Sequence, residues 1–229
     1  MTLSLGLAIC GFLFLRALGS TAKSGERSKV ASLLTALFIG FSVQNGVMGV
    51  GALLFANNSQ ALFVVLMISH LLLAGIAVLG VYTAHYIFAP ESSPKLNMLA
   101  AGAVGLAVWA GMLLTHPNPL LTPQGGIDWN MDARLAALVF YLLLISIGST
   151  CFIFWKLARA TTSRSLRNIS FVLAGLGFLG VLNVFIGLVV LHSASDMTLR
   201  TIALDTGIGI IGIGFVFFLV VAPYFKKRK

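Results

Sequence analysis

Two asparagines inside long apolar runs are the side chains best placed to bind a solute. Asn45 and Asn183 each lie about fifteen residues into such a run, which is about 22 Å along a helix and near the middle of a membrane. A side-chain amide needs a partner there, because lipid offers none. The pair predicts either a polar cavity, with Gln44 beside Asn45, or hydrogen bonds that hold neighbouring helices together. Both readings stay open.

Ionisable side chains inside apolar runs are a second set of candidates. His70 and Asp205 are expected in the outer thirds of their helices, where they could form a proton-linked pair, hold a cation, or simply hydrogen-bond in a packed interface. No cofactor is expected. The alternative is a single haem b, held by His70 with either His116 or His192. No Cys/His spacing fits a metal site.

Three glycines match the spacing of a dinucleotide-binding motif but not its structural context. Gly207-x-Gly209-x-x-Gly212 reproduces a dinucleotide fingerprint, but no strand precedes it and the run is apolar. Small residues instead let membrane helices approach closely. The glycines expected at helix contacts are Gly102, Gly105, Gly175, Gly207, Gly209 and Gly212. With no paired carboxylates and no nucleophile elbow, the sequence predicts a non-catalytic protein.

Composition sets the class of protein that must position these residues. Of 229 residues, 59% are apolar and 9% are charged, and the mean hydropathy is +1.01. A soluble domain carries about 25% charged residues. A water-solvated globule, a disordered chain and a nucleic-acid-binding domain are therefore excluded, despite a net charge of +9.

The apolar runs predict an all-α integral membrane protein that forms one domain over residues 1–229. A membrane helix needs about 20 mainly apolar residues. Seven transmembrane helices are expected, at about Leu3–Leu18, Val30–Ala56, Ala61–Ala89, Leu96–Thr115, Ala133–Trp155, Ile169–Leu191 and Thr201–Tyr224. The longest connection, His116–Asp132, contains three prolines and a Gly-Gly pair, which break regular structure.

Basic residues predict the orientation of these helices. Thirteen of the fifteen Lys and Arg residues fall on one side of the seven-helix plan, leaving Arg134 and Arg200 on the other. Cytoplasmic loops carry the excess of positive charge. The amino terminus is therefore expected outside and the carboxyl terminus in the cytoplasm. The first run is expected to be a retained helix rather than a signal peptide, since its basic residues follow it.

Matching patterns predict an internal repeat. Arg16 and Lys156, Asn45 and Asn183, and the Ala-Pro pairs at 89 and 222 recur at offsets of 140, 138 and 133 residues. Residues 1–90 and 133–225 would then be parallel copies, related by an axis along the membrane normal, with 96–115 as a linker helix. This three-plus-one-plus-three plan resembles the SWEET and PQ-loop transporters in topology alone. Their helix prolines are absent, and the only Pro-Gln pair, Pro123-Gln124, lies in a loop.

Three classes of function fit this pattern. The first is a non-catalytic subunit or scaffold of a membrane protein complex, which the lack of soluble domains and chemical motifs favours. The alternatives are a small-solute transporter or channel with a mid-membrane polar site, and a haem-bearing or sensory seven-helix protein. The expected partners are the lipid bilayer and other membrane subunits or further copies of the chain, not nucleic acid. The expected location is a bacterial or archaeal inner membrane.

Overall fold

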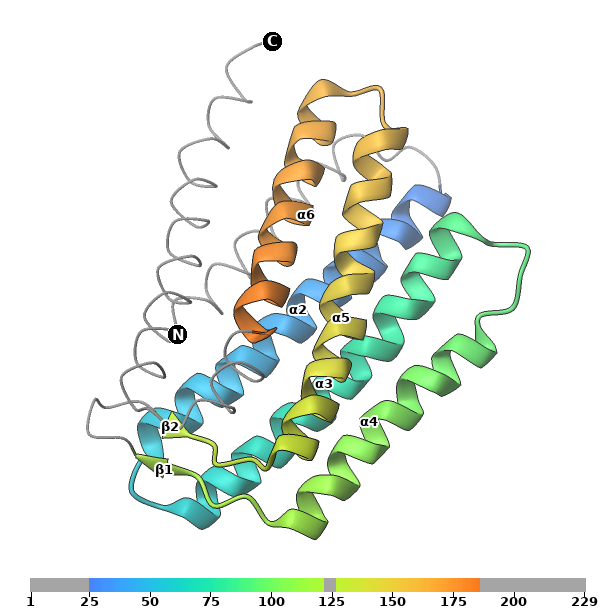
Figure 1. Ribbon diagram of the computed structural model, residues 1–229. Helices are drawn as coiled ribbons and strands as arrows, with labels where there is room; N and C mark the ends of the chain where they lie inside the picture. The colour runs from blue at the N-terminus through green and yellow to red at the C-terminus, as the bar shows by residue number, and fades with distance from the viewer. Residues whose placement is uncertain (1–24, 122–126, 186–229) are drawn as a thin grey trace.

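The apolar runs fold into long helices that run between the two ends of a bundle (Figure 1). This computed structural model describes residues 25–121 and 127–185. The helices are α2 (Gly25–Leu54), α3 (Ser59–Phe88), α4 (Lys95–Thr115), α5 (Ala133–Ala160) and α6 (Arg164–Phe185). Two short strands, β1 (Leu120–Leu121) and β2 (Ile127–Asp128), form an antiparallel hairpin between α4 and α5.

Four helical segments are long and apolar enough to cross a membrane. They are Ser32–Leu54, Ser59–Phe88, Lys95–Thr115 and Ala133–Ala160. The shortest has 21 residues and therefore spans about 31 Å, close to the hydrocarbon thickness of about 30 Å. Several apolar helices of this length suggest an integral membrane protein, as composition predicts.

The remaining parts of the seven-helix prediction fall largely outside the described residues. The first and seventh runs lie there, and the sixth is seen as α6 only as far as Phe185. The seven-helix count, the orientation and the repeat therefore stay predictions. Within the described ranges three helices extend five residues beyond the predicted runs. Helix α2 begins at Gly25 rather than Val30, α5 ends at Ala160 rather than Trp155, and α6 begins at Arg164 rather than Ile169. Hydropathy marks where a helix leaves the hydrocarbon, and a basic segment can continue the same helix beyond that point.

Local capping explains where the helices begin and end. The Asn58 side chain accepts a hydrogen bond from the Ala61 amide at 3.0 Å, and the Asp132 carboxylate accepts one from the Leu135 amide at 2.7 Å. Each satisfies an amide that has no partner inside its own helix. His116 ends α4 in the left-handed conformation, with φ of 44°, and Pro117 follows it. The connections are therefore ordered by side chains that the sequence places at helix ends.

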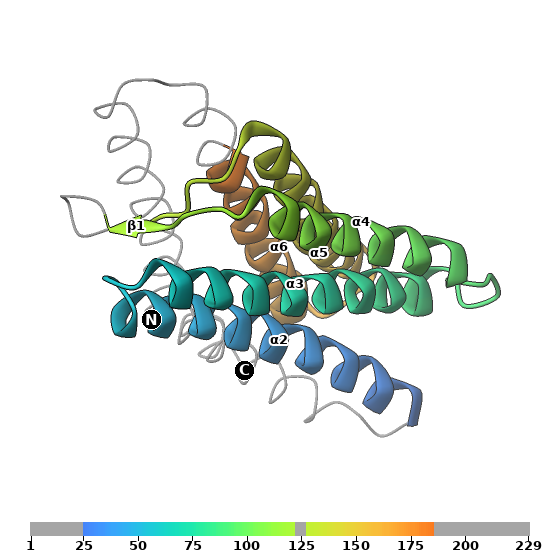
Figure 2. The ribbon, with the colours of Figure 1, turned by 90° about the horizontal axis from the view of Figure 1, so that it is seen from below.

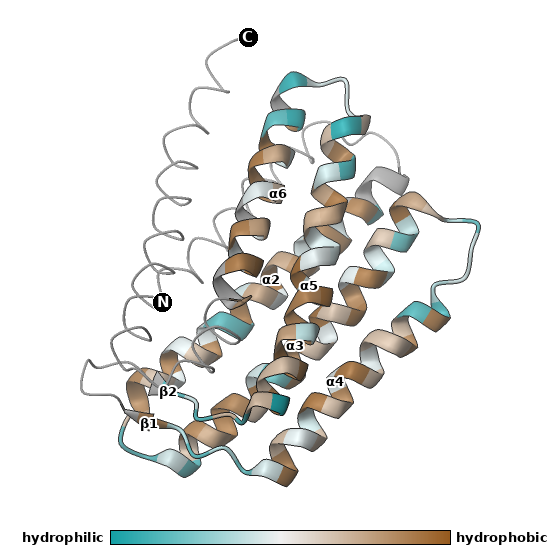
Figure 3. Ribbon diagram, in the orientation of Figure 1, coloured by the Kyte–Doolittle hydropathy of each residue, from teal (hydrophilic) through white to brown (hydrophobic). Residues whose placement is uncertain are grey.

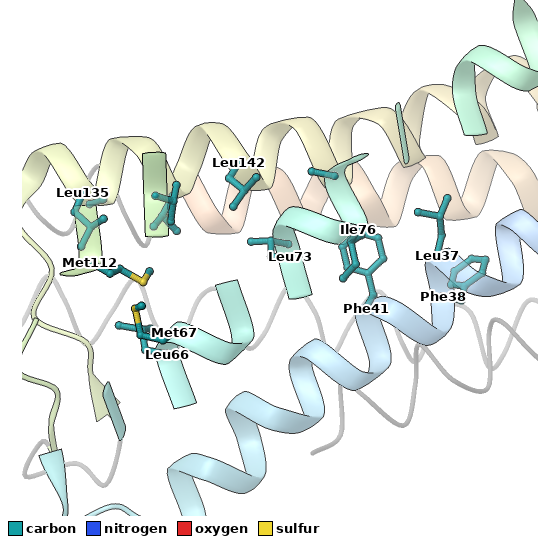
Figure 4. Packing of buried hydrophobic residues seen from close by; sticks show 14 of the residues in the cluster. Leu37, Phe38, Phe41, Leu66, Met67, Leu73, Ile76, Met112, Leu135 and Leu142 are labelled. Atoms are coloured by element: carbon teal, nitrogen blue, oxygen red, sulfur yellow. The ribbon is translucent and has the colours of Figure 1, made fainter. Parts of the chain in front are cut away.

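Helix α3 is the centre of the packing. It contacts α2, α4 and α5, and α5 in turn contacts α4 and α6. Figure 2 shows α3 lying between α2 and the layer that contains α4, α5 and α6. Figure 4 shows side chains from four helices converging on one apolar core; those labelled are Leu37, Phe38, Phe41, Leu66, Met67, Leu73, Ile76, Met112, Leu135 and Leu142.

The two ends of the bundle differ in charge. Figure 3 shows hydrophilic residues gathered near helix ends and apolar residues between them. We call one end the basic end, because the antiparallel helices bring seven cations to it: Arg27, Lys29, Lys95, Lys156, Arg159, Arg164 and Arg167. The other, the hairpin end, holds β1 and β2 together with Asp128, Asp132 and Arg134.

Candidate functional site

One side-chain hydrogen bond crosses between two helices in the buried middle of the bundle. Gln44 of α2 donates through Nε2 to Ser69 Oγ of α3 at 2.9 Å. Gln44 is 8% exposed and Ser69 is fully buried. Ser69 lies about 15 Å along α3 from Ser59, which is mid-membrane depth. This amide therefore holds two helices together, and it is the neighbour of the asparagine that the sequence pattern singles out.

Asn45 itself bonds within its own helix. Its Nδ2 donates to the Phe41 carbonyl at 2.9 Å, and the side chain is half-buried. Asn183 lies in α6, but the structure describes only its backbone. The structure therefore does not bring the predicted asparagine pair together, and a cavity or contact shared by the two amides stays a prediction.

His70 is buried, and one nitrogen of its imidazole ring hydrogen-bonds to the backbone of its own helix. It is 5% exposed, and Nδ1 lies 2.8 Å from the Leu66 carbonyl oxygen. That oxygen can only accept, so Nδ1 carries the proton of the neutral ring and Nε2 carries a lone pair. A histidine fixed in this way can accept a hydrogen bond or bind a metal through Nε2. Its expected partner Asp205 lies outside the described residues.

The other histidines lie toward the ends of the bundle. His116 is exposed, and its ring centroid is 5.8 Å from that of Phe63 at the hairpin end. His85 is in the last turns of α3, with Nε2 2.5 Å from Ser92 Oγ. His192 lies outside the described residues. Over residues 25–121 and 127–185, no three His, Cys, Asp or Glu side chains gather to share a metal ion. The haem alternative stays an untested prediction.

A run of hydroxyls on α5 is a polar feature that the candidate residues named from the sequence do not include. Ser146 Oγ donates to the Leu143 carbonyl at 3.0 Å, and Ser149 and Thr150 both donate to the Ser146 carbonyl, at 3.0 and 2.9 Å. Gly80 of α3 packs directly against Ser149. The signal was present as small and polar residues at 146 and 148–151, a composition typical of close helix contacts.

The described glycines differ in how closely another helix approaches them. A Cβ at Gly105 of α4 would lie 2.5 Å from the Ala74 Cβ and 3.4 Å from its Cα, so backbone meets backbone there. A Cβ at Gly102 would make ordinary contact with Val78 at 3.9 Å, and one at Gly175 would meet no described atom within 4 Å. Gly207, Gly209 and Gly212 lie outside the described residues.

One buried hydroxyl differs from the hydrogen-bonded polar side chains described above. Ser170 of α6 is fully buried, and among the described residues its Oγ is the buried side-chain atom with no hydrogen-bond partner. The neighbouring sequence contains no feature that distinguishes Ser170 from an ordinary packing serine.

The arrangement is therefore a set of mid-membrane polar groups that bond to the protein itself. Amides and hydroxyls of α2, α3 and α5 donate to carbonyls or to one another, and one imidazole keeps a lone pair. Comparison with known protein families, with curated proteins and with solved structures finds no match to this chain.

Proposed function

We propose that this chain is a non-catalytic, multi-pass membrane protein that serves as a subunit or scaffold of a membrane protein complex. The observation that carries the proposal is the buried Gln44–Ser69 hydrogen bond between α2 and α3. A mid-membrane amide whose donor is already bonded to a neighbouring helix stabilises a fixed packing. It is not available to coordinate a passing solute through that donor.

Other polar side chains of the spans support the same reading. Ser42, Asn45 and Thr83 donate to the backbone carbonyls one turn before them, at 2.7–2.9 Å. These bonds satisfy hydroxyls and amides without a water-filled cavity. Close approach at Gly105 and Gly80 adds the dense packing expected of a rigid framework.

The proposal includes an orientation with the basic end in the cytoplasm. Seven described cations lie at that end against one at the hairpin end, and the cytoplasmic side carries the excess of Lys and Arg. A phosphatase reporter, which is active only outside the cell, should be inactive when fused after Lys229 and active when inserted between residues 122 and 126. The reverse pattern would reverse the proposed orientation.

The test of the complex is native mass spectrometry of the full chain, extracted from its own membranes into lipid nanodiscs. We expect an assembly of fixed stoichiometry that contains further membrane subunits or additional copies of the chain. Purified protein in liposomes should not speed light-scattering changes driven by glycerol or glucose gradients. A monomer that speeds them, and loses that activity in Asn45→Leu, would overturn the proposal.

A transporter is the second candidate, and the imidazole of His70 is the observation that favours it. Its Nε2 lone pair is not engaged by any described residue, although the ring is 5% exposed. A group of this kind can take up a proton from a transported species or from a neighbouring acid. The liposome assay with His70→Gln tests it: flux in the unmodified protein that the variant abolishes would favour transport over a scaffold.

A further inference from the structure

Four cations surround the turn that joins α5 to α6. Lys156 and Arg159 lie in the last turns of α5, and Arg164 and Arg167 lie in the first turns of α6. All four side chains are exposed. The sequence has no acidic residue between Asp132 and Asp196, so no carboxylate of α5, α6 or the turn between them can neutralise this charge. The turn is therefore a concentrated positive patch at the basic end.

Exposed aromatic rings lie beside two of these cations. The Arg159 guanidinium is 4.8 Å from the Trp155 ring centroid, and the Lys156 ammonium is 5.5 Å from that of Phe152. Both rings are exposed, at 41% and 43%, and their centroids are 6.4 Å apart. The amphipathic ring of a tryptophan at the end of a membrane helix typically lies at headgroup level. The cations above them are therefore placed where phosphates of the lipid lie.

Helix stability does not account for all of these positions. Lys156 and Arg159 lie near the carboxyl end of α5, where the helix dipole favours cations, whereas Arg164 and Arg167 lie near the amino end of α6, where it disfavours them. The other basic corner of the same end differs, because Lys95 has Glu91 four residues before it. The α5–α6 turn thus concentrates charge that no carboxylate of α5, α6 or the turn offsets, and an anion from outside the chain would offset it.

We propose that the α5–α6 turn binds the headgroup of an anionic phospholipid. Arg159, Arg164 and Arg167 would contact the phosphate, and the acyl chains would lie along the Phe152–Trp155 face of α5. Clusters of four or more Lys and Arg immediately beside a membrane helix are typical of such recognition. The inference concerns a different surface from the buried α2–α3 contact and does not depend on the proposed function.

The test measures which lipid lies next to Trp155. The sequence has three tryptophans, so Trp109→Phe and Trp129→Phe leave Trp155 as the only one in the full chain. This protein is placed in nanodiscs of phosphatidylcholine and phosphatidylglycerol, with bromine on the acyl chains of one lipid at a time. Bromine quenches only nearby tryptophan, so the two quenching curves give the relative binding constant of the anionic lipid.

We expect phosphatidylglycerol to be clearly preferred at Trp155. Arg164→Gln with Arg167→Gln should lower this preference by roughly fivefold for each cation removed at low salt. Arg164→Lys with Arg167→Lys keeps the charge and should retain most of the preference. Lys95→Gln, the matched control at the other corner of the basic end, should leave it unchanged. Quenching by brominated phosphatidylcholine checks that each variant is folded and inserted.

Three results would overturn the proposal. One is equal quenching by the two brominated lipids in the protein whose only tryptophan is Trp155, with all its arginines retained. Another is an equal loss of preference in Lys95→Gln, which would indicate general attraction to a charged surface. The third is complete displacement by millimolar inorganic phosphate, which would assign the patch to a soluble anion instead of a lipid.

Discussion

The middle of the bundle and its α5–α6 turn hold polar groups in opposite ways. In the middle, Gln44 bonds Ser69 across two helices, and the hydroxyls of α5 bond carbonyls of their own helix. At the turn, Arg159, Arg164 and Arg167 are exposed, and no acidic residue lies in either helix that carries them. Gln44 and the hydroxyls of α5 are thus satisfied by the protein, whereas the arginines of the turn are left for the surroundings.

The difference follows from what each environment offers. Hydrocarbon provides no donors or acceptors, so each polar group in the middle must find its partner within the protein. The headgroup region provides water and phosphate, so cations there can keep their charge without a carboxylate from the chain. Substitutions in the middle should therefore alter stability, whereas substitutions at the turn should alter lipid binding.

The largest effect is expected where two backbones meet. Gly105→Leu places a side chain where a Cβ alone would lie 2.5 Å from the Ala74 Cβ, so α3 and α4 must separate. Overpacking of this kind costs about 1–3 kcal/mol. Unfolding by dodecyl sulfate in mixed micelles measures the loss. Gly175→Leu is the matched control, because a Cβ there meets no described atom within 4 Å; equal losses in both variants would contradict a special role for the α3–α4 approach.

A smaller loss is expected at the amide that crosses between helices. Gln44→Leu removes the hydrogen bond to Ser69 and should lower the free energy of unfolding by about 0.6 kcal/mol, the average for such bonds in membrane proteins. Asn45→Leu should cost less, because its bond to Phe41 lies within α2 and survives when the helices separate. The same titration compares the two variants. A larger loss for Asn45→Leu would show that Asn45, rather than Gln44, joins the helices.

Ser170 offers a substitution that should raise stability. Its hydroxyl is buried without a described partner, and replacing it with alanine removes a polar group that must otherwise be desolvated. We expect a gain of about 0.5 kcal/mol for Ser170→Ala in the same assay. Ser146→Ala should bring no gain, because the Ser146 hydroxyl already donates to the Leu143 carbonyl. A loss at Ser170 would indicate that the hydroxyl has a partner in the intact bundle.

The smallest effect is expected at the turn. In bicelles of neutral phosphatidylcholine, Arg164→Gln with Arg167→Gln should leave the free energy of unfolding unchanged, because neither arginine has a carboxylate partner in α5 or α6. The measurement is the same titration in that lipid. A clear loss of stability there would remove the contrast with the middle of the bundle, since the arginines would then be part of its packing.

Much of the described fold could be predicted along the chain. The helices α3 and α4 begin and end within two residues of the apolar runs expected at 61–89 and 96–115, because span length is set by the local sum of apolar residues. The short hairpin at 120–128 cannot be predicted from the sequence, since its strands are two residues each and carry no alternation of polar and apolar residues. The helix caps Asn58 and Asp132 also depend only on residues close to them in the sequence.

The polar contacts could not be predicted in that way. Residue type and depth single out Asn45, but which amide reaches another helix depends on how α2 is rotated about its axis, and that rotation points Gln44 at Ser69. Likewise the sequence does not distinguish Gly105 from Gly175. In the structure, Gly105 packs against the backbone of Ala74, whereas a Cβ at Gly175 would meet no described atom within 4 Å. The sequence by itself determined that the chain forms apolar helices with charge gathered at one end, because burial in lipid depends on composition summed over each run. The tertiary structure alone decided which side chains meet, because those contacts depend on the rotation and crossing of helices far apart in the chain.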